Sequence, residues 1–426
     1  MIALVWAVAA LLLASGLALA YVIGGGAVLG FLATDNARYL AILPQKVFSQ
    51  ISVFSLMAMP LFILAGELMN RGGVTRTLID LSMALVGRLR GGLGHVNILT
   101  SVFFAGISGS AIADAAALSN TLVPAMKERG YSGLYAGAIT AASSIIGPIV
   151  PPSIILIFYG AIMQTSVAAL FVAGIVPGLV LAGGLFAVNA FYAHRDDHPR
   201  IEKGEAPPVH RAVWQALPAL ALPGIIVGGI VFGWMTPTEA AVVAVFAALG
   251  AGAFYAGFTR EDLLESLKRT ALLTGSIFVI LCAAATLGHL AALERMPQTV
   301  ADFVAGAGLG PVGFMIAMNV AFIIAGMVLD IPVALALLVP LLAPVALKMG
   351  ADPVHLGIVI CFNLSIGLVS PPLGGCLVIV STVTGLNYWQ LARRVIPFVI
   401  VQILVLALLV AVPDITLFLP RLAGLM

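Results

Sequence analysis

The sequence contains few charged residues. Only 9% of its 426 residues are Asp, Glu, Lys or Arg, whereas soluble domains carry roughly 25%. The formal net charge is +2, without the basic excess that nucleic-acid-binding proteins use, so nucleic acid is excluded as a partner. Hydrophobic residues make up 62% of the chain, and the mean hydropathy is +1.15. This composition predicts an all-α polytopic membrane protein in a lipid bilayer.

Cysteine and histidine are also scarce. The three cysteines, Cys282, Cys361 and Cys376, lie in apolar runs, so we expect them to pack in the interior rather than form a disulfide framework. The six histidines show no metal-binding cluster, because His194 and His198 share an i,i+4 spacing only within a Pro-containing polar segment. The sequence therefore predicts neither a disulfide nor a transition-metal site.

The N-terminus lacks the basic n-region of a signal peptide. Residues 3–13 are continuously apolar, so we expect a first membrane crossing over 3–23 rather than a cleaved leader. Further apolar stretches, each about 20 residues or longer, predict more crossings. They fall at 48–70, 133–163, 167–192, 214–234, 238–257, 271–293, 354–382 and 395–412.

Long polar stretches are rare as well. Residues 74–88 and 260–270 are amphipathic, and we expect both segments to lie along the membrane surface. Residues 194–211, "HRDDHPRIEKGEAPPVHR", form the one long polar segment. We expect this segment to be a cytoplasmic linker between an N-terminal half (1–193) and a C-terminal half (212–426).

Two apolar regions, 95–127 and 311–348, have polar or Pro/Gly-marked centres. These centres read "AGISGSAIAD" and "AGMVLDIP". Each arm is about 12–16 residues, or ~18–24 Å of helix, which is shorter than a hydrocarbon core of about 30 Å. Both regions therefore predict re-entrant hairpins, and the alternative is two ordinary short helices that meet in a loop.

The chain repeats itself. A shift of 220 residues places Gly106 on Gly326, Gly147 on Gly367, and Pro151–Pro152 on Pro371–Pro372. Gly and Pro each constrain the backbone, so their coincidence is more informative than that of Ala or Leu. Because Pro breaks helices, 133–163 and 354–382 are each predicted to be a broken transmembrane helix.

The two halves are predicted to have opposite orientations in the membrane. Five crossings separate the hairpins, and an odd number places them on opposite faces, as in inverted-topology repeats. Following the crossings assigns 15 of the 20 Lys and Arg residues to one face, which the positive-inside rule makes cytoplasmic. The first hairpin then enters from the cytoplasm and the second from outside.

Broken helices at membrane depth are typical of ion and substrate sites. Irregular backbone survives there only inside protein or along a wet cavity. Unwound carbonyls can coordinate a small hard cation, and helix N-termini favour an anion. Hydroxyl and amide side chains flank both breaks and the first tip, and they suit Na⁺ better than a transition metal: Ser108, Ser110, Ser143, Ser144, Ser153, Asn363, Ser365 and Ser370.

Four acidic residues have alternative roles. We interpret Asp114 first as a helix-start acid that offsets the helix dipole, whereas Asp330 could equally contact an ion or substrate. Glu67 lies before Asn70–Arg71 and predicts a local ion pair or a structural contact, and Glu239 follows "TPT" as a helix cap or a first-turn acid.

Several motifs together resemble one family. "FAGISGSAIADAAALS" (104–119), "GPIVPPSIILIFYG" (147–160) and "NLSIGLVSPPLGG" (363–375) are similar to the large membrane subunit of tripartite ATP-independent periplasmic (TRAP) transporters, as are stretches at 60–73, 87–97 and 236–244. The resemblance implies Na⁺-coupled uptake of an organic acid across the bacterial inner membrane, for example a C4-dicarboxylate, sialic acid or a related carboxylate. It also implies an elevator mechanism, a small four-helix membrane subunit and a soluble periplasmic substrate-binding protein as separate chains.

The resemblance also implies site residues. The first Na⁺ site would use Ser108, Ser143, Gly147, Val150 and Pro152, and the second would use Gly326, Gly367 and Ser370. The substrate would lie near Ser110, Ser153, Asn363 and Gly374. Ser370 stands where the family usually has Thr, which keeps a hydroxyl at that position.

Three other functions are compatible with a polytopic membrane chain. A stand-alone Na⁺/anion symporter would differ only in needing no binding protein. An intramembrane protease would need a base beside a nucleophile, and no membrane-depth His or Lys accompanies the serines at 108–110. A non-transporting scaffold would leave the duplicated helix breaks without a role.

Overall fold

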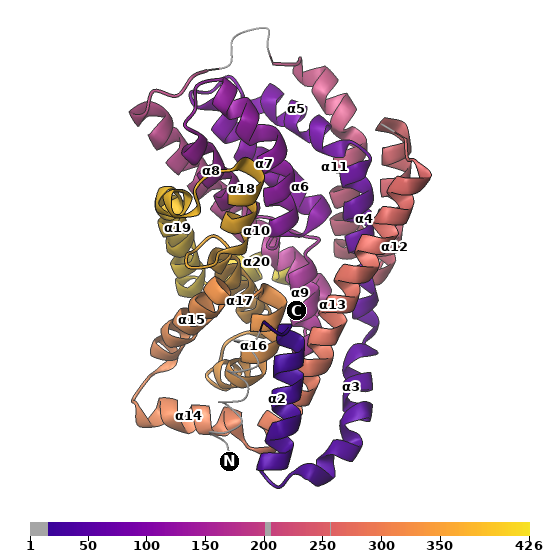
Figure 1. The fold of residues 1–426 in the computed structure, drawn as a ribbon, viewed down its shortest axis with the longest axis vertical. Coiled ribbons are helices and arrows are strands. Elements are labelled where there is room, and N and C mark those ends of the chain that lie inside the picture. The colour runs from indigo at the N-terminus through magenta and orange to yellow at the C-terminus, as the bar shows by residue number, and fades with distance from the viewer. Residues whose placement is uncertain (1–15, 201–205, 256) are drawn as a thin grey trace.

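The protein is entirely helical where it is described. The computed structural model describes residues 16–200, 206–255 and 257–426, and no β-strand occurs among them (Figure 1). The first half contains α2 (Leu19–Ala33), η1 (Ala37–Ile42), α3 (Leu43–Ile51), η2 (Phe54–Met57), α4 (Ala58–Arg71), α5 (Val74–Val86), α6 (Gly92–Ser108), α7 (Ala111–Glu128), α8 (Gly133–Ser144), α9 (Ile154–Met163) and α10 (Val167–Arg195). The second half contains α11 (Val209–Val231), α12 (Pro237–Tyr255), α13 (Arg260–Leu293), α14 (Met296–Gly306), α15 (Pro311–Val328), α16 (Ile331–Lys348), α17 (Pro353–Gly367), α18 (Gly375–Thr384), α19 (Tyr388–Ala411) and α20 (Asp414–Leu422).

The helices have the length and composition of a multi-pass membrane protein. Within the described ranges, seven helices could each cross a bilayer, and a bent pair raises the number to eight. The predicted fold class is therefore confirmed. The predicted linker keeps its place between α10 and α11, although residues 201–205 lie outside the described part of the chain.

The first predicted crossing has a different end. Residues 1–15 lie outside the described residues, but α2 begins at Leu19 and continues to Ala33, beyond the expected end at residue 23. The helix continues through its glycines. Two of them, Gly24 and Gly30, lie against α13 and allow the two helices to pack closely. A Cβ added at Gly24 would meet the Ala283 side chain at 3.5 Å, and one at Gly30 would meet Leu290 at 2.5 Å.

The crossing predicted at 48–70 is not one straight helix. The segment Ala37–Ile51 and the segment Phe54–Arg71 are bent by 61° at a short break. Pro60 lies in the first turn of α4, where backbone N–H groups have no intrahelical partner, so it begins this helix at little cost.

The prediction of a separate surface helix at 260–270 is also wrong. These residues are the first turns of α13, a single helix of 34 residues that a Thr259–Asp262 capping box begins. No Pro or Gly separates Thr270 from the apolar stretch that follows, so the helix continues inward. By contrast, α5 is a separate helix, as predicted, and lies across the upper end of the molecule in Figure 1.

Both hairpins form, with longer arms than predicted. The arms α6, α7, α15 and α16 have 17 or 18 residues, or about 26–27 Å. Since α15 and α16 are each long enough to cross a membrane, length does not identify them as a hairpin. Their position identifies them as a hairpin. The pair α6 and α7 occupies the upper half of Figure 1 and the pair α15 and α16 occupies the lower half, and the tips of both pairs line one cavity.

Both predicted helix breaks are confirmed. The first separates α8 from α9 and contains Pro151–Pro152, and the second separates α17 from α18 and contains Pro371–Pro372. Helices of the two repeats pack reciprocally, because α7 contacts α18 as α16 contacts α9, and α10 contacts α17 as α19 contacts α8. Such reciprocal helix contacts are expected when a two-fold axis relates the two repeats.

Contacts between charged and polar side chains agree with the predicted faces. On the face assigned to the cytoplasm the pairs are Arg71–Asp262 (3.6 Å), Glu67–Arg269 (3.4 Å), Asp196–Arg394 (2.6 Å) and Arg90–Asp197. On the opposite face, the Asn36 amide donates to Glu294 Oε1 at 2.6 Å. Segments far apart in sequence thus meet through charged or polar side chains at the two ends of the molecule.

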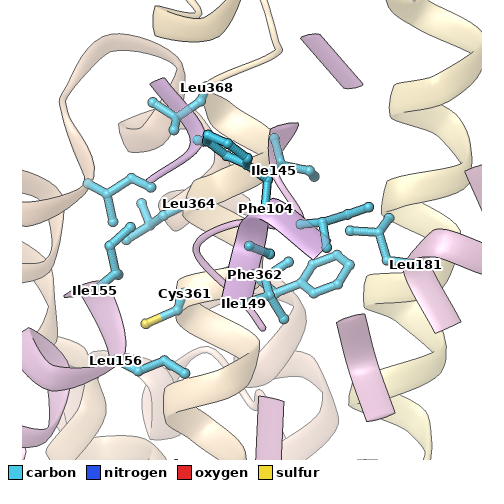
Figure 2. Packing of buried hydrophobic residues seen from close by; sticks show 14 of the residues in the cluster. Phe104, Ile145, Ile149, Ile155, Leu156, Leu181, Cys361, Phe362, Leu364 and Leu368 are labelled. Atoms are coloured by element: carbon cyan, nitrogen blue, oxygen red, sulfur yellow. The ribbon is translucent and has the colours of Figure 1, made fainter. Parts of the chain in front are cut away.

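Buried apolar side chains surround the helix breaks. Phe104 of α6, Ile149 of the first break, Leu181 of α10 and Phe362 of α17 are all buried and belong to one cluster (Figure 2). Side chains from both repeats therefore hold the broken segments in place.

Candidate functional site

A cavity of about 1290 Å³ lies between the hairpin tips and helices α4, α5 and α13. Its inner end is lined by residues 108–113, Pro148 and residues 330–332. Charged residues at the end of the molecule that the charge count assigns to the cytoplasm also line it: Glu67, Arg76, Asp80, Glu128, Arg129 and Arg269. The cavity therefore connects the meeting point of the two tips with the face assigned to the cytoplasm.

Two helix N-termini begin at the inner end of this cavity. Ser110 caps α7, where its hydroxyl accepts from the Ala113 N–H at 3.4 Å. Asp330 caps α16, where its carboxylate accepts from the Ile331 N–H at 3.0 Å. Both helices have 18 residues, so partial positive charge from each points at the cavity.

The first tip presses against the first helix break at Gly109. This residue has φ +59°, and a Cβ there would lie 2.5 Å from the Pro152 carbonyl oxygen. Only glycine fits both the left-handed backbone and this close approach. The contact brings Ser108 and Ser110 beside the carbonyls of the break, as the resemblance implied.

Asp114 is the residue that the sequence analysis undervalued. Its side chain is fully buried, and its Oδ1 accepts a hydrogen bond from the Ser108 hydroxyl. The other oxygen, Oδ2, has no hydrogen-bond partner and faces Gly147, where a Cβ would lie 2.6 Å away. Asp114 lies in the first turn of α7, as predicted, but it is also buried against the first helix break. The available signal was its place one turn into an arm that starts at membrane depth.

Ser143 belongs to a different hydrogen-bond network. Its hydroxyl donates to Asn97 Oδ1 and accepts from the Ser101 hydroxyl, both at 2.9 Å, which ties α8 to α6. The Ser143 hydroxyl therefore has protein partners already, unlike Asp114 Oδ2.

The remaining residues predicted around the first break are mostly structural in their side-chain contacts. The Ser153 hydroxyl donates to the Pro148 carbonyl and accepts from the Leu156 N–H at 3.2 Å, which caps α9. The Val150 side chain lies against α10 at Gly178. Any contribution of Val150, Pro152 or Gly147 to an ion site would come from backbone carbonyls.

The second group of predicted residues also comes together. A Cβ on Gly367 would lie 2.5 Å from the Gly326 Cα, so the backbones of α15 and α17 touch there. The Ser370 hydroxyl donates to the Ile366 carbonyl at 2.9 Å within the second break. Gly374, at φ +48°, lies close to the Ser370 carbonyl.

Asn363 joins α17 to α15. Its Nδ2 donates to the Asn319 carbonyl at 2.9 Å and to Asn319 Oδ1 at 2.7 Å, while its own Oδ1 is buried without a partner. Of the four predicted substrate residues, Ser110 lines the cavity, whereas Ser153, Asn363 and Gly374 do not. The cavity instead includes Asp330, Glu67 and Arg269, of which the sequence analysis weighed the first two.

The donors at this site are oxygen atoms. Across the described residues, no group of three or more His, Cys, Asp or Glu side chains could hold a metal ion. Hydroxyls, backbone carbonyls and one carboxylate suit a hard cation rather than a transition metal.

Comparisons with known proteins agree with this architecture. A profile of the family described as "Tripartite ATP-independent periplasmic transporter, DctM component" matches residues 5–415. The "Sialic acid TRAP transporter large permease protein SiaM" of Vibrio cholerae is 37% identical over 92% of this chain and 92% of its own length. The "Isethionate TRAP transporter permease protein DctMQ" of Oleidesulfovibrio alaskensis is 37% identical over 88% of this chain and 59% of its own length.

A solved structure shares the fold. The YdaH transporter of Alcanivorax borkumensis, described as having an unusual topology, matches with a TM-score of 0.66 and 14% identity over 90% of this chain and 89% of its own. The sequence relatives are permease proteins rather than enzymes, and the apolar helices make this a multi-pass inner-membrane protein. The chain belongs to the DctM family, the large permease component of tripartite ATP-independent periplasmic transporters.

Proposed function

We propose that this chain imports an organic acid by Na⁺ symport, after a periplasmic substrate-binding protein has delivered the acid. The observation that carries the proposal is the buried, unpartnered Asp114 Oδ2 between the first hairpin tip and the first helix break. A buried carboxylate oxygen without a partner is costly, and a bound cation would supply that partner.

Two Na⁺ sites follow from this placement. The first would use the Ser108 hydroxyl, Asp114 and backbone carbonyls of the first break at Gly147, Val150 and Pro152, with Ser143 one turn away. The second would use Gly326, Gly367 and Ser370 at the corresponding place in the second repeat. The close contact of Gly326 with Gly367 supports this second group, and the Ser370 hydroxyl lies beside the Ile366 carbonyl, one residue before Gly367.

The substrate is an anion because of what surrounds the inner end of the cavity. The helix N-termini of α7 and α16 both begin there, and dipoles with hydroxyls can hold an acid group without a basic side chain. The relatives named above carry different acids in their names, sialic acid and isethionate. A C4-dicarboxylate, a sialic acid or a related acid fits this chemistry. Of the four residues that the resemblance implies for the substrate, Ser110 lines this cavity, whereas Ser153, Asn363 and Gly374 would contact the acid only in another position of the transport domain.

An elevator mechanism accounts for the one-sided cavity. In it, the hairpins and broken helices would move as a transport domain against α4, α11, α12 and α13. The present cavity joins the tips to the cytoplasmic face, which corresponds to an inward-facing position. A small four-helix membrane subunit would complete the scaffold, and the DctMQ relative, of which this chain covers 59%, is long enough to include additional segments.

Uptake into proteoliposomes tests this function. The vesicles would contain the chain with its small subunit, and a panel of labelled acids would be offered with and without an inward Na⁺ gradient and the cognate binding protein. We expect uptake only when both are present. Uptake that needs Na⁺ but no binding protein would make the chain a stand-alone symporter, and Na⁺-independent uptake would refute the coupling.

Two serine variants test the residue assignment in the same assay. Ser108→Ala and Ser370→Ala should each raise the Na⁺ concentration for half-maximal uptake, while membrane insertion is unchanged. Ser276→Ala is a matched control, because this hydroxyl lines the cavity on α13 and donates to the Leu272 carbonyl at 2.9 Å. Unchanged Na⁺ curves in both variants would show that the assigned sites are wrong.

A further inference from the structure

Two helix faces form the cavity wall opposite the first hairpin. The cavity-lining residues of these faces follow helical spacing: Ile63, Gly66, Glu67 and Asn70 on α4, and Arg269, Leu273, Ser276, Ile277 and Ile280 on α13. Most of both faces is apolar or uncharged. Glu67 and Arg269 are the charged residues on them, and they lie side by side as an ion pair.

This ion pair lies close to the first hairpin tip. A Cβ added at Gly66, one residue before Glu67, would lie 3.3 Å from the Ile107 carbonyl oxygen and 3.4 Å from the Ser108 Cα. Arg269 follows Arg260, the first residue of α13, by nine positions, which is about 13 Å along the helix. Arg269 therefore lies inside the cavity wall, between the tip and the cytoplasm.

The pair leaves the guanidinium available to a second anion. Arg269 Nη1 lies 3.5 Å from Glu67 Oε1 and 3.4 Å from Oε2, longer than the roughly 2.7–2.9 Å of a tight charge-assisted hydrogen bond. The exposed fraction of the side chain is 56% for Arg269 and 13% for Glu67. A guanidinium carries five N–H donors, and this contact uses a single nitrogen.

A second ion pair joins the same two helices outside the cavity. Arg71 of α4 and Asp262 of α13 lie 3.6 Å apart, with charges in the reverse arrangement, and neither residue lines the cavity. The Arg71–Asp262 pair already links α4 to α13 outside the cavity. A role in joining the two helices therefore does not by itself explain why Arg269 faces the cavity.

We propose that Arg269 forms an exit site for the acid group of the substrate, a carboxylate or a sulfonate. This inference rests on the proposed function. A cation in a cleft with low-dielectric walls concentrates the field and attracts anions, so Arg269, which lines the same cavity as the hairpin tips, can bind an acid that leaves them. Glu67 competes for the same guanidinium, which keeps the site weak and lets the acid escape to the cytoplasm.

The two halves of the pair then have opposite effects when neutralised. Arg269→Gln removes the anion contact, so it should weaken binding of the acid from the cytoplasmic side by about three- to fivefold. Glu67→Gln frees the guanidinium, so it should strengthen that binding by a similar factor. Arg269→Lys keeps the charge and should retain part of the affinity. Arg71→Gln, which breaks the pair outside the cavity, should leave it unchanged.

The experiment measures inhibition by acid on the cytoplasmic side. Uptake driven by an inward Na⁺ gradient and external binding protein selects transporters whose cytoplasmic face is toward the vesicle lumen. Unlabelled acid at rising concentration is enclosed in the lumen, and the concentration that halves the initial uptake rate is recorded for each variant. Equal ionic strength is kept with choline salts.

Each outcome separates the exit site from a structural tie. Opposite shifts for Arg269→Gln and Glu67→Gln, with Arg71→Gln unchanged, support the exit site. Shifts in one direction for both members of the pair, or the same shift for Arg71→Gln, overturn it, as does a lack of luminal inhibition in an active transporter. Failure of the proposed function is distinguishable, because the unsubstituted chain would then show no Na⁺- and binding-protein-dependent uptake.

Discussion

Replacement of Asp114 by Asn is the sharpest test of how this protein couples to Na⁺. The amide has nearly the volume of the carboxylate and can still accept from Ser108. It removes the negative charge that is fully buried and whose Oδ2 has no partner. Without Na⁺, the variant should therefore unfold at the same temperature as the unsubstituted chain or a higher one, because an unpaired buried charge is more costly than a buried amide.

With Na⁺ the expected result is reversed. A ligand present at a hundred times its dissociation constant stabilises the folded state by about 2.7 kcal/mol. Loss of one charged contact costs about 1.5–3 kcal/mol, which weakens Na⁺ binding roughly ten- to 150-fold. At the same Na⁺ concentration, a hundredfold loss leaves only about 0.4 kcal/mol of stabilisation.

Thermal unfolding of the detergent-solubilised chain measures both effects. Midpoints would be compared in sodium chloride and in choline chloride at equal ionic strength. Asp302→Asn is the matched control, because it neutralises an exposed acid on α14. If Asp114→Asn keeps the full Na⁺-dependent shift, or if it is less stable than the unsubstituted chain in choline, the reasoning about the orphaned oxygen is refuted.

Three further predictions concern the second repeat and the topology. Ser370→Ala should weaken Na⁺ stabilisation in the same unfolding assay, and an unchanged shift would remove Ser370 from the second site. Gly367→Ala should destabilise the fold by about 1–3 kcal/mol, because the added Cβ meets the backbone of α15. Gly183→Ala is the control, since open space surrounds this residue, and it should be neutral or slightly stabilising. Equal thermal unfolding midpoints for the two variants would contradict this prediction. Cysteines that replace Arg200 and Lys348 should react with an impermeant reagent from opposite faces, and labelling from one face would contradict the inverted repeat.

Much of the architecture follows from the sequence because membranes restrict the choices. Apolar length identifies crossings, and paired prolines identify broken helices, since few other structures satisfy backbone polar groups in lipid. The short arms and polar centres predicted both hairpins, the repeated Gly and Pro positions predicted both breaks, and the count of Lys and Arg predicted the orientation. Where sequence reasoning was wrong at 3–23 and 260–270, it mistook where helices begin or end, because composition changes gradually along a continuous helix. At 48–70 it missed the bend of 61° between two helical segments.

Asp114 and Arg269 show what only the tertiary structure decided. In the sequence, Asp114 is one more acid near a helix start, and Arg269 is one basic residue among several in an amphipathic stretch. Their roles depend on which atoms of distant segments face them. Gly147 lies beside Asp114 Oδ2, and Glu67 lies beside Arg269 on the same cavity wall. Local pattern determines which helices form, whereas burial and missing partners are properties of the packed helices and become defined only when segments distant in sequence come together.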